Sequence, residues 1–454
     1  MTKNDEYFVD FKQNFNPEIF YETKVVLQTP SVTMPRIKTI TSGDISTFID
    51  IILNLNSSEI TEDNIVDILI KYKKFNINLY GDETWLKLFP NRFQVSDCTS
   101  SFFVKDYYEV DQNVTRNIPQ ILANLSQWDM VIMHYLGLDH IGHVEGPFSK
   151  RVKPKLIEMK NVVKWIIEGL SNSSYWNSTL VIVTGDHGMS DLGGHGGATV
   201  NELTTSIMFF NQKLHRLESL DDKSPIFQSD ISTSISLLTG VPIPINSVGV
   251  ISFRLLSMID ELQDRSNALY SNFHHFINND CDQFQEFVLP YKNIRAKLDQ
   301  LNRICQTPIG NETCVTEINE QHLGLIKLLK EMQKVKMSKS SSFNTLYMEI
   351  GMGLLSFSLI HSVLHIFQFS NARTLHLYNI GRFFIVILVM SILFPENFCE
   401  FPIYFFIKFS IFIIGFFVFL ILCRKSKALN ATSCNASLSV SLVLLFCNTG
   451  VFHK

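Results

Sequence analysis

The sequence predicts an α/β domain with a mostly parallel sheet flanked by helices, followed by a C-terminal α-helical transmembrane region. Three observations favour this fold class. Short β-rich runs alternate with helical patterns along the first 340 residues, which is typical of a parallel sheet covered by helices. A glycine closely follows each run. From about residue 346 the chain turns into apolar blocks rich in Phe, Leu and Ile.

The predicted strands cover residues 76–80, 130–135 and 180–184. The last two are apolar nearly throughout, so we expect them to be buried on both faces. Between them, residues 154–170 carry apolar side chains at helical spacing, which predicts a helix. We therefore divide the chain into a globular α/β part over 1–260, a helical neck or appendage over 261–342, and a transmembrane region of about three or four helices over 343–454.

The membrane region contains segments of different length. Residues 346–367 and 401–423 are long enough for spans of about 20 residues. Residues 383–394 and 438–452 are shorter, and buried core helices are the alternative for them.

Loop charges predict the orientation of these spans. Arg373 and Arg382 lie in the loop after the first span, and Arg424 and Lys425 follow the third. By the positive-inside rule these loops face the cytoplasm, which places the globular part in the lumen. Three lysines just before the first span favour the opposite orientation, but a large translocated domain tolerates such charges.

Composition excludes one class of partner and leaves the cysteines open. The net charge of -4, without a dense basic patch, excludes nucleic acid. The eight cysteines contain no CxxC pair. Cys305 and Cys314 could close a short loop as a disulfide, and free buried thiols are the alternative.

The N-terminal segment and the glycosylation sequons give opposite indications about whether the chain is translocated across a membrane. The first 24 residues are polar and lack the apolar core of a signal peptide. The globular part nevertheless holds N-x-S/T sequons, which favour a translocated glycoprotein. The acceptor residues are Asn56, Asn113, Asn124, Asn172, Asn177 and Asn311.

Three glycine-flanked polar clusters stand at or just beyond the ends of predicted strands, where open α/β sheets place their ligands. Carboxylates and neutral imidazoles are ligands that Zn²⁺ accepts, with open positions left for substrate. Any one cluster could be a helix cap beside a satisfied histidine, whereas three together favour a metal site. We regard His134 and His140 as bystanders. The candidate ligands are Asp139 and His143, then Asp186 and His187, and finally His195.

A two-metal site performs phosphoryl transfer by activating a nucleophile and neutralising charge on the attacking and leaving oxygens. The candidate nucleophiles lie upstream, in a hydroxyl-rich turn at residues 28–36 that contains two prolines. Taken alone, this segment also fits an ordinary proline turn with capping hydroxyls.

Five long motifs occur in order along the chain: PSVTMPRIK, YGDETWLKLFP, HYLGLDHIGHVEGP, VTGDHGMSDLGGHGG and TGVPIPINSVG. Together they make the segment from about residue 25 to residue 256 resemble the alkaline phosphatase superfamily. Within it, the segment resembles the glycosylphosphatidylinositol (GPI) ethanolamine phosphate transferases. The amino-acid sequences of the second and third motifs most resemble those of the subtype that modifies the second mannose.

The resemblance implies a two-zinc site, a covalent intermediate and lipid substrates. Ser31 would be the nucleophile, where this family usually carries threonine, with Thr33 as the alternative. It would take phosphoethanolamine from phosphatidylethanolamine and pass it to a mannose of the GPI-anchor lipid intermediate. The implied ligands are Asp139, His143 and His195 for one zinc ion, and Asp186 and His187 for the other.

The resemblance also implies a location, a partner and an upstream segment. We expect the endoplasmic reticulum membrane with the catalytic domain in the lumen, and a small hydrophobic membrane subunit as a partner. The family begins with a membrane anchor and a strand that ends in an aspartate of the second metal site, and no such strand precedes Ser31. We therefore expect residues 1–260 to be an N-terminally incomplete catalytic domain. Its neighbouring strands should expose their edges, and the chain should transfer poorly without that segment.

Two other functions remain open. The metal residues do not distinguish acceptors, so a metal-dependent phosphodiesterase or phosphatase that uses water is one alternative. The other is a catalytically impaired membrane subunit that only binds a partner. Metal content separates the last from the enzymes, and the identity of the acceptor separates the two enzymes.

Overall fold

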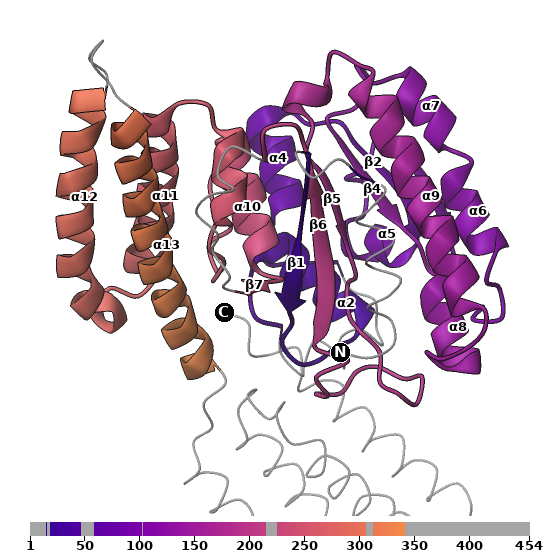
Figure 1. Ribbon diagram of the computed structural model, residues 1–454. Helices are drawn as coiled ribbons and strands as arrows, with labels where there is room; N and C mark the ends of the chain where they lie inside the picture. Colours follow the sequence, from indigo (N-terminus) through magenta and orange to yellow (C-terminus); the bar gives the residue numbers. More distant parts are fainter. Residues whose placement is uncertain are drawn as a thin grey trace, which may run out of the picture. The chain divides into compact units, whose positions relative to one another are not determined.

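The computed structural model of the chain describes residues 15, 19–46, 59–101, 103–214, 225–305 and 312–340 (Figure 1). They belong to one compact unit, Met1–Ser340. The predicted membrane region at 343–454 lies outside the described residues, as do the sequons at Asn56 and Asn311. Within the described part of the chain, no helix combines the length and apolar character needed to cross a membrane.

Strands and helices are interspersed along the chain. The strands are β1 (Phe20–Val26), β2 (Ile77–Asp82), β3 (Val95–Thr99), β4 (Met130–His134), β5 (Val181–Thr184), β6 (Thr204–Phe210) and β7 (Ile226–Phe227). The α-helices are α2 (Thr33–Ser42), α4 (Ile65–Lys73), α5 (Thr84–Leu88), α6 (Glu109–Thr115), α7 (Ile118–Ala123), α8 (Gly137–Glu145), α9 (Val152–Ser171), α10 (Asp230–Thr239), α11 (Leu262–Asn279), α12 (Gln285–Cys305) and α13 (Glu312–Ser340). Short 3-10 helices are η1 (Trp176–Ser178), η3 (Phe253–Met258) and η4 (Asp282–Phe284).

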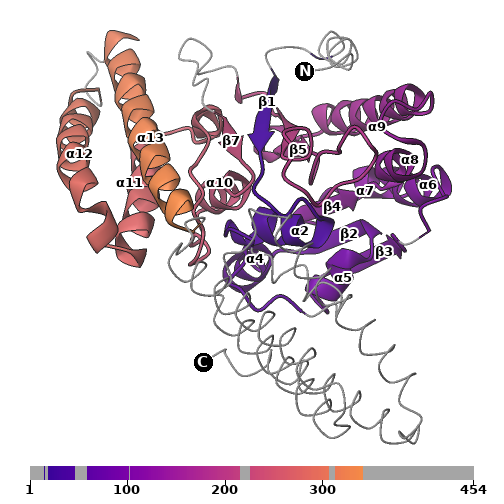
Figure 2. The same cartoon turned by 90° about the horizontal axis from the view of Figure 1, so that it is seen from below.

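The described strands form two sheets (Figure 2). One has the order β3-β2-β4 and is parallel throughout. The other has the order β5-β6-β1-β7, in which β6 runs antiparallel to both β5 and β1. The predicted α/β fold with parallel strands and flanking helices is confirmed. The antiparallel strand β6 is an addition that the sequence pattern did not reveal.

The strands and the helix predicted from the pattern are present with small shifts. β4 and β5 begin within one residue of their predicted starts, and α9 contains the whole predicted helix. Val163, Ile167 and Leu170 recur at helical spacing on α9 and pack with Met208 and Phe210 of β6. Burying each such side chain contributes about 1.5–3 kcal/mol, so this face holds the helix on the sheet.

The burial of β4 and β5 differs from the prediction. Their residues are only partly buried, not buried on both faces. Among the described strands, β4 pairs only with β2 and β5 only with β6, so each has an open edge. Complete burial was a wrong prediction, because an apolar run does not by itself determine how fully neighbouring elements cover a strand.

Helices α11, α12 and α13 occupy the segment for which a helical neck or appendage is predicted, and the first of them begins at Leu262. Their core includes Phe273, Leu298 and Leu325, all nearly inaccessible to solvent. Because the appendage and the α/β part belong to one compact unit, the domain boundary stays a prediction. Cys305 and Cys314 form a disulfide with their Cα atoms 6.0 Å apart, which decides between the two alternatives for this pair.

The appendage contains a buried histidine that makes its stability pH-dependent. The Nε2 atom of His322 lies 2.8 Å from Ser266 Oγ, and the ring is fully buried. Burial, together with the charge of Arg265, lowers the pKa of His322 to about 3. An unfolded histidine titrates near ~6.5, so His322 favours folding above that pH, and this contribution is lost as the pH falls from 6.5 towards 3.

We expect the His322→Gln variant to resist mild acid better than the unmodified chain. Below about pH 6, the unmodified chain should lose about 1.4 kcal/mol of stability per pH unit relative to the variant. Urea unfolding of both proteins at about pH 7, 6 and 5 measures this difference. A difference in unfolding free energy that does not change with pH would contradict the assignment.

Candidate metal and nucleophile site

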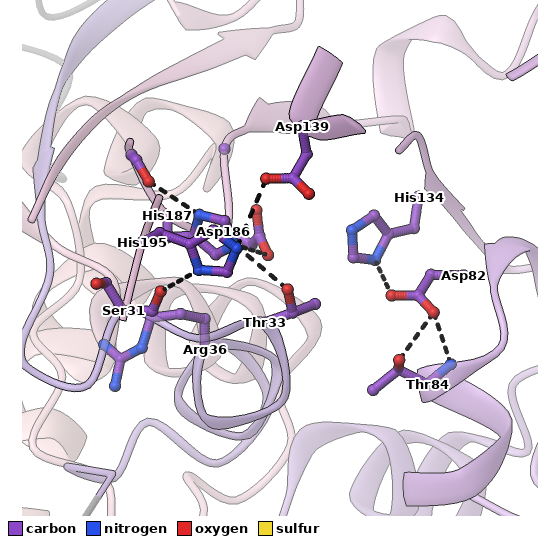
Figure 3. A network of polar contacts seen from close by, with 12 residues as sticks. Ser31, Thr33, Arg36, Asp82, Thr84, His134, Asp139, Asp186, His187 and His195 are labelled. Atoms are coloured by element: carbon purple, nitrogen blue, oxygen red, sulfur yellow. Dashed lines mark hydrogen bonds and ion pairs between the residues drawn. The ribbon is translucent and has the colours of Figure 1, made fainter. Parts of the chain in front are cut away.

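Helix α8 and a glycine-rich loop after β5 bring the first predicted ligand set together at the carboxyl end of β4. Asp139 and His143 lie one turn apart on α8, with Asp139 Oδ2 3.4 Å from His143 Nε2. His195 arrives from the loop, and its Nε2 lies 3.7 Å from Asp139 Oδ1 and 2.9 Å from His143 Nε2 (Figure 3). The three side chains offer ligand atoms within 4.8 Å of one another.

The protonation of His195 suits metal binding. Its Nδ1 lies 2.8 Å from the carbonyl oxygen of Ser31 and must donate to it, because a carbonyl only accepts. In the neutral ring, Nε2 is therefore unprotonated. Burial and the neighbouring His187 lower the pKa of His195, which favours this neutral form. One carboxylate and two imidazoles, with two ring nitrogens in close contact, form a donor set that fits a cation such as Zn²⁺.

The second predicted ligand set directly follows β5. Asp186 Oδ2 lies 3.3 Å from His187 Nε2, and Thr33 Oγ1 lies 3.2 Å from the same nitrogen. Burial alone would raise the pKa of Asp186, but His187 and then His134 outweigh it, so the pKa is lowered and the carboxylate stays ionised. The rings of His187 and His195 stack with centroids 3.8 Å apart. The two ligand sets therefore adjoin and form one site.

The two candidate nucleophiles lie in different surroundings. Ser31 is fully buried. Its hydroxyl donates to the carbonyl oxygen of Gly197 at 3.0 Å and accepts the backbone N–H of Gly196 at 2.8 Å. Thr33 is the first residue of α2, and its hydroxyl faces His187 (Figure 3). Thr33, the predicted alternative nucleophile, thus lies beside the second ligand set. The hydroxyl of Ser31 is instead hydrogen-bonded to the loop that carries His195.

The two histidines predicted as bystanders are absent from the ligand cluster at Asp139. His140 is buried, with its ring nitrogens 2.7 Å from the carbonyl oxygen of Asp106 and 3.3 Å from that of Ser101. His134 accepts the indole N–H of Trp85 at 3.0 Å. The site prediction omitted Asp82, which lies beside His134. Its signal in the sequence was the GDETW motif at the end of a predicted strand.

One glycine shows why the loop before His195 needs small residues. Gly193 has a φ of +85°, and a Cβ there would lie 2.4 Å from the backbone oxygen of Gly142 on α8. Any side chain would therefore push the loop away from α8. This close approach keeps His195 beside Asp139 and His143.

Comparisons with known proteins identify what the chain is similar to. The family model for type I phosphodiesterase / nucleotide pyrophosphatase matches residues 70–231. GPI ethanolamine phosphate transferase 2 of Aspergillus oryzae is 42% identical over 51% of this chain and 29% of its own length. The catalytic subunit of human GPI ethanolamine phosphate transferase 2 is 42% identical over 49% of this chain and 23% of its own. The predicted resemblance to these transferases is confirmed.

A further relative and a solved structure extend the comparison. The Yarrowia lipolytica GPI ethanolamine phosphate transferase 2 is 32% identical over 80% of this chain and 41% of its own length. The chain thus spans less than half the length of these relatives. An alkaline phosphatase superfamily protein from Vibrio parahaemolyticus aligns with a TM-score of 0.34 and 14% identity, covering 49% of this chain and 59% of that protein.

We expect the same substitution to remove bound zinc at one histidine and to leave it in place at another. His195→Gln should remove one bound zinc ion and lower transferase activity at least about 100-fold, because a lost ligand removes several kcal/mol of charge stabilisation. His140→Gln, the matched control, should retain zinc and most activity and lose only stability. Zinc per chain and activity are measured on both purified variants. Equal activity losses with zinc retained in both would contradict the ligand assignment.

Proposed function

We propose that the whole protein transfers phosphoethanolamine from phosphatidylethanolamine to a mannose of the GPI anchor, the second mannose being the acceptor. The observation that carries this proposal is the Thr33 hydroxyl, 3.2 Å from His187 Nε2, beside two adjoining sets of carboxylates and imidazoles. The activity named for the relatives supports the choice of substrates.

Thr33 is the proposed nucleophile, in place of Ser31. It stands at the N-terminus of α2, where the helix dipole favours negative charge on a phosphoryl group. In the first step the bond from Thr33 Oγ1 to phosphorus forms and the bond from phosphorus to the diacylglycerol oxygen breaks. The hydroxyl proton leaves with diacylglycerol. In the second step the mannose oxygen replaces Thr33 on phosphorus, and its proton returns to Thr33.

Two zinc ions fit the proposed chemistry. Asp139, His143 and His195 would hold one, and Asp186 and His187 the other. Bound zinc would activate the hydroxyl and neutralise charge on the phosphoryl oxygens. The residues themselves prepare the site, since the Ser31 carbonyl keeps Nε2 of His195 unprotonated and the lowered pKa of Asp186 keeps its carboxylate charged.

The second ligand set has two side chains, whereas catalytic zinc sites commonly use three. We propose that in the whole protein a strand lies between β4 and β5 and ends in the missing ligand. The open edges of these strands support this proposal, because a strand placed there would end near Asp186, which follows β5.

Two alternatives use the same residues. A phosphodiesterase or phosphatase would take water instead of mannose as acceptor. A non-catalytic membrane subunit would bind a partner without needing metal. Incubation of zinc-loaded protein with a lipid extract separates them, because only the transferase yields a GPI intermediate that carries phosphoethanolamine.

We expect a covalent intermediate on Thr33. With phosphatidylethanolamine as donor, mass spectrometry should find phosphoethanolamine on the peptide that contains Thr33, and Thr33→Ala should abolish it. Ser31→Ala should still form the adduct, more slowly, since it disturbs the loop that carries His195 and leaves the attacking hydroxyl in place. If the phosphoethanolamine adduct is retained in Thr33→Ala but lost in Ser31→Ala, Ser31 is the nucleophile instead.

We propose the endoplasmic reticulum membrane as the location, with the described domain in the lumen. Asn172 and Asn177 are exposed sequons and are therefore the expected glycan acceptors. Glycosidase treatment should shift the mobility of the whole protein expressed in cells, and Asn172→Gln with Asn177→Gln should reduce that shift. An unchanged mobility together with cytosolic labelling of these asparagines would contradict the orientation.

A further inference from the structure

A second carboxylate lies beside the site, at the carboxyl end of β2. Asp82 is the last residue of that strand and is fully buried. Its Oδ1 atom accepts both the backbone N–H and the hydroxyl of Thr84, each at 2.8 Å. One oxygen of this carboxylate therefore has its donors.

The other carboxylate oxygen of Asp82 has no hydrogen-bond donor among the described residues. Asp82 Oδ2 is buried without a hydrogen-bond donor. The nearest basic atom is Nδ1 of His134 at 3.9 Å, which is beyond hydrogen-bond distance. That nitrogen already accepts the N–H of Trp85, and an indole can only donate, so Nδ1 has no proton to give Asp82. A buried carboxylate oxygen in this state calls for a donor from a ligand.

A neighbouring hydroxyl shares this property. Thr99 is the register partner of Asp82 on β3, and its Oγ1 is also buried without a hydrogen-bond partner in the described structure. Paired residues of parallel strands point to the same face of the sheet. Two acceptor oxygens at one strand end suit a group that donates several hydrogen bonds.

These residues lie next to the phosphoryl site. His134 ends β4, which leads into α8 and its ligands Asp139 and His143. His134 is also close enough to Asp186 to lower the pKa of that carboxyl group. Figure 3 shows Asp82 and His134 on one side of the site, with Thr33 and His195 on the other.

We propose that Asp82 is a specificity residue that accepts the ammonium group of the phosphoethanolamine unit. The inference rests on the proposed function, since the phosphoryl group must lie at the metal ligands for its two-carbon amine to point towards Asp82. A primary ammonium is compact and offers three N–H donors, which matches a buried acceptor oxygen that lacks a donor. A metal ion is a poorer fit, because Asp82 Oδ2 has no free imidazole beside it.

The same geometry predicts which head groups are rejected. The quaternary ammonium of choline has no N–H to donate and is larger, so the enclosed carboxylate would exclude it. A neutral ethyl group would leave Asp82 unpaired in the complex. Asp82 would therefore select ethanolamine phosphodiesters from a lipid mixture.

The test is calorimetric binding of three small phosphates to the zinc-loaded full chain in detergent micelles. The ligands are O-phosphoethanolamine, ethyl phosphate, which lacks the amine, and O-phosphocholine. A charge-assisted hydrogen bond should make O-phosphoethanolamine bind at least about tenfold tighter than ethyl phosphate. In Asp82→Asn this ratio should fall to about one, with ethyl phosphate affinity unchanged. The control is Asp97→Asn, whose carboxylate is already paired with Arg116, and it should keep the ratio.

The outcomes separate the two proposals. Equal affinities of the unmodified chain for O-phosphoethanolamine and ethyl phosphate overturn the role of Asp82 and leave the phosphoryl site standing. Binding of neither ligand overturns the proposed function and the inference with it. If Asp82→Asn does not fold, the affinities of the three ligands for the unmodified chain still test whether the site selects a primary ammonium group. Tight binding of O-phosphocholine to that chain also counts against the inference.

Discussion

The site depends on the hydrogen bonds of one buried residue, Ser31, which tie the turn before α2 to the loop after β5. Its hydroxyl accepts from Gly196 and donates to Gly197, while its carbonyl accepts from Nδ1 of His195. Each bond contributes only about 1 kcal/mol, but the three together fix the loop, the ring orientation and the tautomer of His195. The same fixed turn leaves Thr33, two residues further on, facing His187. Ser31 thus positions both His195, a candidate metal ligand, and the hydroxyl of Thr33, the proposed nucleophile.

Fixing the loop also joins the two ligand sets electrostatically. His187 and His195 stack face to face, with ring centroids 3.8 Å apart. Burial and then the neighbouring His187 lower the pKa of His195, while the carboxylate of Asp186 stays ionised. Neutral imidazoles beside ionised carboxylates are the state that binds cations. Burial and the neighbouring His187 therefore favour the form of His195 that can bind a metal ion.

The sequence predicted the outline of this site better than its details. Strand ends and glycines were enough to group Asp139 and His143 with His195, because parallel strands end at one edge of a sheet. The choice between Ser31 and Thr33 depended on which residue begins α2 and on a loop 164 residues away in sequence from Ser31, and neither is visible in a local pattern. The burial of β4 and β5 was predicted wrongly for a related reason, since apolar composition does not say how many neighbours a strand has.

Three carboxylates line the carboxyl edge of the described strands, and the imidazoles beside each one set its chemistry. Asp139 has His143 and His195, which complete a candidate metal site. Asp186 has His187, whose Nε2 also faces the hydroxyl of Thr33, so this set places a candidate cation site beside the proposed nucleophile. Asp82 has only His134, and the indole of Trp85 occupies the nitrogen that would have faced it. A carboxylate without an available imidazole lacks the partner that each of the other two has for binding zinc, and its free oxygen is better suited to a cation that brings its own hydrogen-bond donors.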